Sequence, residues 1–159
     1  MKCDVRRASS EDIPAVLGLL RELAAFEGKL DYVEVTEARL AEHAFGPHAC
    51  IEMLLGSVDG QAVSYAIFFP HFGSFRGRPW LFLEDLYVQP AARGTGVGRA
   101  MMSELARIVV ERSWAGMTWG VLEWNLAAFS FYERLGAVRA NGHVFMELSG
   151  EALERVAGQ

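Results

Sequence analysis

The fold is decided by residues 80–98, WLFLEDLYVQPAARGTGVG, which form a predicted strand, a glycine-rich turn and the start of a helix. Residues 80–88 are almost all apolar, as expected of a strand at the centre of a sheet. In the turn RGTGVG (residues 93–98) the alternating glycines let the backbone approach a ligand and aim N–H groups at it. A helix N-terminus also attracts negative charge, so this unit predicts an anion site, with a turn that serves only backbone geometry as the alternative.

Two known phosphate-binding loops do not fit this turn. A Walker A loop requires Lys and then Ser or Thr after its last glycine, whereas Gly98 is followed by Arg99 and Ala100. The dinucleotide fingerprint requires a glycine where this sequence has Arg99 or Met101. A pyrophosphate remains a suitable ligand, since Arg93 and Arg99 could add charge-assisted hydrogen bonds to the backbone N–H groups.

Hydrophobic periodicity predicts the elements on either side of this unit. Strands are expected at Lys2–Ala8, Cys50–Val58, Gln61–Phe69, Trp80–Val88, Thr118–Leu122 and His143–Leu148. Helices are expected from a Ser9 cap to about Ala25, from a Thr36 cap to about Ala44, from Gly98 to about Ser113, and over Ala127–Leu135 and Glu151–Ala157. Asp59-Gly60 predicts a tight hairpin turn, and residues 70–79 a loop. Strands and helices mix without strict alternation, so we expect one domain over residues 1–159 with an α/β (α+β sandwich) fold.

Composition narrows the classes of function. The chain has 159 residues, 52% of them hydrophobic, and a formal net charge of −5, which indicates one folded domain and excludes disorder. Its acidity disfavours nucleic acid and suits a cationic small molecule, although surplus carboxylates also serve solubility. No secretory signal or membrane-spanning run is apparent, and Cys3 and Cys50 lack metal spacing, so we expect a cytoplasmic protein with free thiols.

Two carboxylates, Glu84 and Asp85, interrupt the apolar strand. A carboxylate among apolar neighbours is costly unless it is paired or faces water. Strand side chains alternate, so we expect the two to face opposite sides of the sheet. One could then face a cleft, where partial desolvation raises its pKa and suits a general base, while the other meets a helix end or a basic partner. The alternative is that both are simply solvated at an edge.

A third cluster comprises Glu123, Trp124 and Asn125 at the end of a predicted strand, followed by Tyr132 on a short helix. Asn125 is placed to cap that helix. Tyr132 lies two turns further along the same face, where its hydroxyl could donate a proton or only pack. The four histidines (His43, His48, His71 and His143) show no ligand spacing, so no metal site is expected. No Gly-x-Ser-x-Gly elbow supports a serine hydrolase.

The stretch LEDLYVQPAARGTGVG (residues 83–98) resembles the signature of the GCN5-related N-acetyltransferase (GNAT) family, a central strand followed by R/Q-x-x-G-x-G/A opening a helix. The resemblance covers nearly the whole chain. Within the family, residues 22–46 and 123–137 are similar to the diamine (spermidine/spermine) and thialysine N-acetyltransferase branch. It implies a mixed, mostly antiparallel sheet with helices on both faces, acetyl-CoA as co-substrate, a small-molecule amine as acceptor and a homodimer, with no nucleic-acid or membrane partner.

The resemblance also implies roles for individual residues. Leu86, Tyr87 and Val88, in a bulged strand, would bind the pantetheine arm through their backbone. Arg93, Gly94, Thr95, Gly96, Val97 and Gly98 would hold the pyrophosphate, and Asn125 and Ala128 would contact the cofactor across a splay between strands. Tyr132, also at the cofactor, would protonate the leaving thiolate, and Glu84 would accept the proton of the amine directly or through water. The residues expected at the amine are Phe26, Glu27, Glu84, Asp85, Glu123 and Trp124.

One departure from the polyamine enzymes bears on the acceptor. Their segment after the short helix is longer and offers a further acidic residue, whereas the segment here, residues 138–141, is shorter and has Arg139. This favours another primary amine, such as a lysine analogue, over spermidine. Two other functions stay open at this point: a non-catalytic acyl-CoA sensor, which needs no acid or base, and a protein-lysine acetyltransferase.

Overall fold

The computed structural model describes residues 2–140, 142 and 144–158. A five-stranded sheet has the order β1-β2-β3-β4-β5, from β1 (Cys3–Arg7), β2 (Glu52–Val58), β3 (Gln61–Gly73), β4 (Arg78–Val88) and β5 (Met117–Trp119). All neighbours are antiparallel except β4 and β5, which are parallel. The chain divides into two compact units, residues 1–120 and 121–159, and the first unit holds the whole sheet.

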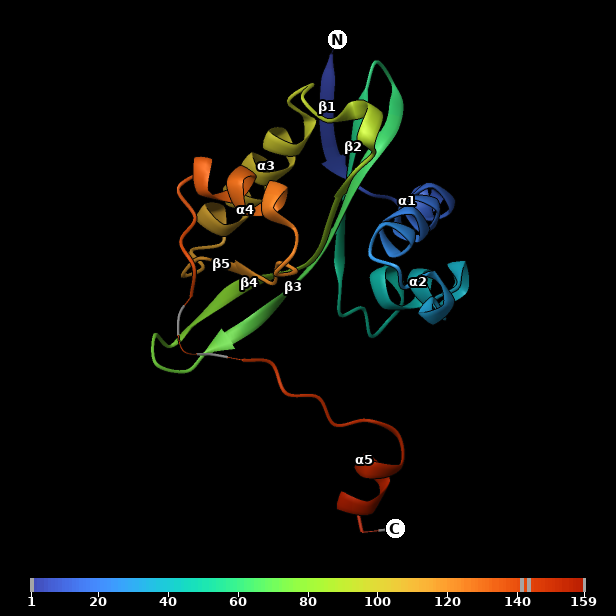
Figure 1. Cartoon of the computed structure of the whole chain (residues 1–159), viewed down its shortest axis with the longest axis vertical. Coiled ribbons are helices and arrows are strands. Elements are labelled where there is room, and N and C mark those ends of the chain that lie inside the picture. Colours follow the sequence, from blue (N-terminus) through green and yellow to red (C-terminus); the bar gives the residue numbers. More distant parts are fainter. Residues whose placement is uncertain (1, 141, 143, 159) are drawn as a thin grey trace. The chain divides into compact units, whose positions relative to one another are not determined.

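Helices cover both faces of the sheet in the first unit (Figure 1). On one face α1 (Ile13–Phe26) and α2 (Glu37–Phe45) pack through a core that includes Tyr65, Ile67 and Tyr87 of the sheet. On the other face lies α3 (Val97–Glu111), whose Met101 and Val97 side chains approach Gly56 of β2. The expected mixed, mostly antiparallel sheet between helices is therefore confirmed.

Several local signals in the sequence specify the elements that form. Ser9 begins a capping box with Asp12, whose Oδ2 accepts from the Ser9 N–H at 2.7 Å, and the short 3-10 helix Ser10–Asp12 leads into α1. Thr36 caps α2, its Oγ1 accepting from the N–H of Arg39 at 3.2 Å. Asp59 and Gly60 have φ values of 49° and 84°, as a tight β2–β3 turn of primed type requires. These predictions are confirmed.

The prediction of a loop over residues 70–79 is correct only for residues 74–77 and wrong for the rest, because β3 and β4 remain paired as far as Gly73 and Arg78. Pro70 is tolerated within β3 because it lies opposite Leu81, whose N–H points away from β3 and donates to Gly116. The missing N–H of Pro70 therefore removes no hydrogen bond to β4, and β2 ends before it, at the pair Glu52 and Phe68. The glycine, proline and arginine residues of this stretch are typical of a loop, but the pairing of β3 with β4 makes most of it part of the sheet.

The second unit contains α4 (Leu126–Arg134) and α5 (Gly150–Val156). The bounds of both helices lie within one residue of those predicted from the sequence. The predicted strand over residues 143–148 is wrong for residues 144–148, which have no strand hydrogen bonds, and His143 lies outside the described residues. Strand β5 is also shorter than predicted and ends at Trp119. A strand needs a neighbour that supplies its hydrogen bonds, and an alternating sequence pattern does not specify that neighbour.

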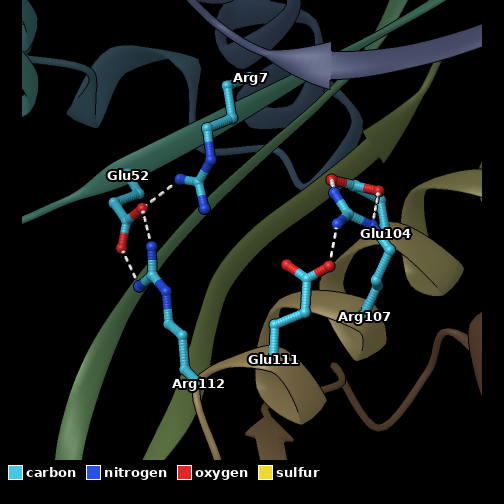
Figure 2. Close-up of polar contacts among 6 residues, drawn as sticks. All are labelled: Arg7, Glu52, Glu104, Arg107, Glu111 and Arg112. Carbon is cyan, nitrogen blue, oxygen red and sulfur yellow. Dashed lines mark hydrogen bonds and ion pairs between the residues drawn. The ribbon is translucent and has the colours of Figure 1, made fainter.

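Ion pairs fasten α3 to the first two strands of the sheet (Figure 2). The carboxylate of Glu52 on β2 accepts a hydrogen bond from Arg7 of β1. It also accepts two hydrogen bonds, of 2.5 Å and 2.8 Å, from Arg112, the residue after α3. Arg112 also lies over the ring of Trp114. Burial alone would raise the pKa of Glu52, but the hydrogen bonds from the two guanidinium groups hold it below its ordinary value.

Candidate active site

Strand β4 carries a β-bulge at Glu84. Leu83 pairs with Phe68 and Asp85 pairs with Ile67, so Glu84 is the extra residue between two consecutive residues of β3. Directly paired residues point to the same face, so Asp85 shares the face of Ile67, which α1 and α2 cover, and Leu83 lies on the opposite face. The structure thus places a bulge in the strand where the resemblance implied one, at Glu84 and before residues 86–88.

Asp85 lies in a desolvated, acidic environment on the α1 face. Its Oδ2 accepts a hydrogen bond from the hydroxyl of Tyr65 at 3.1 Å. Burial raises the pKa of Asp85 to about 6 against the opposing effect of this hydrogen bond, and the charges of Glu84 and Glu27 add to the rise. The hydrogen-bond partner of Asp85 is thus a phenol and not a basic side chain, and the end of α1 near it carries another carboxylate, Glu27.

The expected amine residues of the first unit gather around this bulge. Glu84 is exposed, and Glu27, the C-cap of α1, lies close enough to act electrostatically on both Asp85 and Tyr65. Lys29 pairs with Glu27, Nζ to Oε2 at 3.1 Å. Phe26 is 42% exposed and lies under the guanidinium of Arg93, 5.3 Å from its ring centre. The first unit thus presents three carboxylates and an exposed aromatic ring at one end of α1.

The glycine turn is held on one side and open on the other. Val97 is buried with Val63 and Ala92, and the Thr95 hydroxyl donates to the carbonyl of Ala92 at 2.7 Å. At Gly94 and Gly96, which have φ of 82° and 97°, a Cβ would meet no atom within 4 Å. Gly96 caps α3, whose first N–H groups have no acceptor within the helix. A rigid turn with open glycines at a helix N-terminus fits a diphosphate.

The edge of β4 after the bulge extends beyond its neighbour β5, which pairs with β4 only from Leu81 to Leu83. The N–H of Gln89 donates to Val63, and the carbonyl of Tyr87 accepts from the Ser64 hydroxyl, so these residues point their backbone groups toward β3. Leu86 and Val88 consequently point theirs to the other edge, since strand residues alternate. An extended amide-containing arm such as pantetheine could add to this edge as a strand does.

Three hydrogen bonds connect this edge with the glycine turn and with α1. Arg93 donates from Nε to the carbonyl of Val88 at 3.2 Å. Glu22 of α1 accepts from the hydroxyl of Tyr87 at 3.2 Å and from the side-chain amide of Gln89 at 2.8 Å. Helix α1, strand β4 and the glycine turn are therefore held together at the point where both substrates are expected.

The second unit holds the remaining candidates. Asn125 caps α4, and its Oδ1 accepts from the N–H of Ala128 at 3.2 Å, as predicted. Tyr132 lies further along α4 with its ring 5.1 Å from that of Phe131, and burial raises the pKa of Tyr132 to about 12. Glu123 and Trp124 form an exposed turn before the helix. Tyr132 thus stays protonated at physiological pH, as a proton donor must.

The segment that departs from the polyamine enzymes is partly described. Arg139 lies over the ring of Phe129, 4.3 Å from its centre, and its Nε is 3.9 Å from Glu133. Asn141 lies outside the described residues. Among the residues that the structure describes, no three His, Cys, Asp or Glu side chains gather as metal ligands, and no helix is long and apolar enough to cross a membrane.

Sequence reasoning missed two residues of the first unit. Tyr65 is fully buried in β3, and only its position within an apolar strand could have signalled that its hydroxyl needs a polar partner. Glu22 gave no signal, because it falls among the polar positions of an amphipathic helix. Each forms a hydrogen bond with a residue far away in sequence: Tyr65 with Asp85, and Glu22 with Tyr87.

Comparison with known proteins shows which family this chain resembles. The sequence pattern described as the Acetyltransferase (GNAT) family matches residues 18–137, which includes the bulged strand, the glycine turn and α4. A thialysine N-epsilon-acetyltransferase of Bos taurus is 30% identical over 166 residues, spanning 98% of this chain and 97% of that protein. The human spermidine/spermine N(1)-acetyltransferase-like protein 1 is 33% identical over 141 residues, which are 84% of this chain and 20% of that protein.

Solved structures share the fold. An integron cassette protein from the mobile metagenome of V. cholerae, VCH_CASS6, superposes with a TM-score of 0.82 at 21% identity, covering 100% of this chain and 99% of that one. A crystal structure titled as a probable acetyltransferase gives a TM-score of 0.81 at 20% identity, covering 93% and 99%. At these identities the likeness concerns the fold alone.

Proposed function

Because the chain belongs to the GNAT acetyltransferase family, it is an acetyl-CoA-dependent N-acetyltransferase, and we propose that its acceptor is the primary amine of a small molecule. The candidate acceptors are a diamine, a polyamine or a lysine analogue such as thialysine. The family and the named relatives support N-acetyl transfer. The observation that carries the acceptor class is the acidic environment at the β4 bulge.

That environment suits a cation. Burial raises the pKa of Asp85, and the charges of the nearby Glu84 and Glu27 raise it further; a bound ammonium group would relieve the repulsion among these three carboxylates. Lys29 compensates only one of them, Glu27. Within the amine class, Arg139 in place of an acidic residue favours a lysine analogue over a long polyamine.

The chemistry follows from the pKa of the acceptor. An alkyl ammonium has no lone pair at neutral pH, so a base must take its proton before it attacks. Glu84, exposed at the bulge, takes this proton directly or through water. The nitrogen then forms a bond to the thioester carbonyl carbon, and the bond from that carbon to sulfur breaks. Tyr132 gives its proton to the departing thiolate, and the resulting phenolate takes up, directly or through water, the second proton that the nitrogen loses as the amide forms. No covalent enzyme intermediate is needed.

The remaining proposed residues bind the donor. Backbone groups of Leu86, Tyr87 and Val88 hold the pantetheine arm, and residues 93–98 hold the pyrophosphate, supported by the open glycines and the helix N-terminus. Asn125 and Ala128 are also proposed to contact the donor. Holding donor and acceptor in one ternary complex makes the transfer effectively unimolecular. The homodimer and the cytoplasmic location stay predictions.

The test measures release of coenzyme A from acetyl-CoA with a panel of diamines, polyamines, thialysine and free lysine. Turnover with a small amine is expected, and calorimetry with coenzyme A alone should register binding. Binding without release across the panel would replace the proposal with a non-catalytic acyl-CoA sensor. Release only with lysine-containing peptides would indicate a protein-lysine acetyltransferase.

A further inference from the structure

The Tyr65 hydroxyl is placed where the proposed reaction gives it no role. Tyr65 is fully buried, its side chain lies on the same sheet face as Asp85, and the hydrogen bond between them spans 3.1 Å. The two residues belong to adjacent strands, β3 and β4, and are brought together because the bulge at Glu84 puts Asp85 on the α1 face. A Phe at position 65 would satisfy the core equally well, so the hydroxyl needs another explanation.

Resting on the proposed function, we propose that Tyr65 is a positioning residue, which orients the Asp85 carboxylate to receive the cationic acceptor and keeps it ionised. A phenol that donates one hydrogen bond leaves the other carboxylate oxygen for the ammonium group. A basic partner in its place would neutralise the charge that the acceptor needs. Tyr65 thus fixes the carboxylate without competing for its charge.

The groups that face Asp85 come from three elements. Tyr65 of β3 favours the ionised form, whereas Glu84 of β4 and Glu27 at the end of α1 disfavour it. Burial raises the pKa of the Tyr65 hydroxyl, and the carboxylates of Asp85 and Glu27 and the neighbouring Tyr87 raise it further, so Tyr65 remains a donor throughout the working range of pH. Removal of the hydroxyl leaves only influences that protonate Asp85.

The experiment compares Tyr65→Phe with the full-length wild-type chain in two ways. Carbon-13 NMR follows the titration of the Asp85 carboxyl, which Asp85→Asn identifies. Tyr65→Phe should raise its midpoint by about one pH unit, since a hydrogen bond to a charged group is lost. The ratio of kcat/KM for the amine, variant over wild type, should then be lower about tenfold at pH values below both midpoints than at high pH. This ratio cancels the ionisation of the amine itself.

Tyr87→Phe is the matched control. It removes a phenol from the same sheet face, bonded to Glu22 and not to Asp85, so the Asp85 midpoint should not move. In a Tyr65→Phe/Asp85→Asn double variant the pH dependence of the ratio to Asp85→Asn alone should vanish, which tests the pair even if one single variant folds poorly.

Each possible result supports or overturns the proposed role of Tyr65. An unchanged Asp85 midpoint in Tyr65→Phe overturns the inference, and so does a shifted midpoint with a rate ratio that is flat in pH. In both cases an active wild-type enzyme leaves the proposed function standing. A wild type that acetylates no amine overturns the proposed function and this inference with it.

Discussion

Leu83 and Asp85 are two residues apart on strand β4 and nevertheless lie on opposite faces of the sheet. In a regular strand they would share a face, but Glu84 is an extra residue and reverses the alternation between them. The strand can therefore bury Leu81 and Leu83 against the α3 side and still present a carboxylate toward α1. Because of this one extra residue, β4 contributes both to the hydrophobic core and to the candidate site.

The desolvation of Asp85 has a cost that a variant should reveal. The folded-state pKa of about 6 exceeds the ordinary 3.8, so the native protein holds this proton over a range where the unfolded chain has lost it. Asp85 therefore destabilises the fold as pH rises from 4 to 6 and remains unfavourable above that. We expect Asp85→Asn to be more stable by roughly 1–3 kcal/mol at pH 8 and nearly neutral at pH 4.

Urea unfolding of both proteins between pH 4 and 8 measures this difference. The amide oxygen of Asn can still accept from Tyr65, so packing is retained. Amine turnover should fall in the same variant, because the cationic acceptor loses a negatively charged partner. A stability difference that is equal at pH 4 and pH 8 would contradict the assignment of the shifted carboxyl to Asp85.

Glu84→Gln should affect catalysis without affecting stability. Glu84 is exposed at the bulge, so its replacement should change the free energy of unfolding by no more than about 0.5 kcal/mol. Loss of the proposed base should lower kcat by roughly 10²–10⁴. Steady-state kinetics with calorimetry of acetyl-CoA binding separates the two effects. A kcat within threefold of wild type would transfer the role of base to another group.

Sequence patterns specified most of the fold but less of the site. Caps at Ser9 and Thr36 and the Asp59-Gly60 turn are local, so a few neighbouring residues determine them. The bulge at Glu84 depends on the register between β3 and β4, which a single strand does not contain. The length of the β3–β4 hairpin and the absence of a strand over residues 144–148 likewise depend on partners.

The glycine turn and the Asn125 cap were readable for the same local reason. The partner of Asp85 was not, because Tyr65 lies 20 residues away in sequence and the contact exists only after the bulge has reversed the faces. The residue pattern left open which of the two carboxylates is desolvated, and the family resemblance implied Glu84 as the base; the desolvated carboxylate with the raised pKa is Asp85.

Tyr132→Phe should lower turnover at least tenfold while acetyl-CoA still binds, because only the proton for the thiolate is removed. The pKa of Tyr132, about 12, means that its ionisation should produce no loss of activity below pH 10. Tyr32→Phe is the control, since Tyr32 is 81% exposed and has no proposed role. Turnover equal to wild type in Tyr132→Phe would remove this hydroxyl from the mechanism.

Gly96→Ala should weaken coenzyme A binding about tenfold through the backbone. Gly96 has φ of 97° and space for a Cβ, so the penalty is conformational strain of about 1–2 kcal/mol, relieved by distorting the turn. Gly18→Ala is the matched control in α1, where no atom lies within 4 Å of the new Cβ and the helix should gain about 0.5–1 kcal/mol. Calorimetry with coenzyme A should show unchanged affinity for Gly18→Ala; equal affinities for both variants would remove Gly96 from the binding site.

Glu52 joins β1, β2 and the end of α3, so its loss should cost more than the loss of an ion pair within one helix. Glu52→Gln leaves Arg7 and Arg112 facing each other without a carboxylate, and we expect a loss of roughly 1–2 kcal/mol at pH 7. Glu111→Gln, which breaks only an exposed pair with Arg107 on α3, should cost about 0.3–0.5 kcal/mol.

Because the pKa of Glu52 lies below its ordinary value, the contribution of Glu52 to stability is present above pH 4.5 and is lost as pH falls through the folded-state value. Urea unfolding at pH 7 and pH 3 should therefore show the Glu52→Gln deficit shrinking in acid, and a deficit that grows in acid would contradict the proposed contribution of the Glu52 ion pairs.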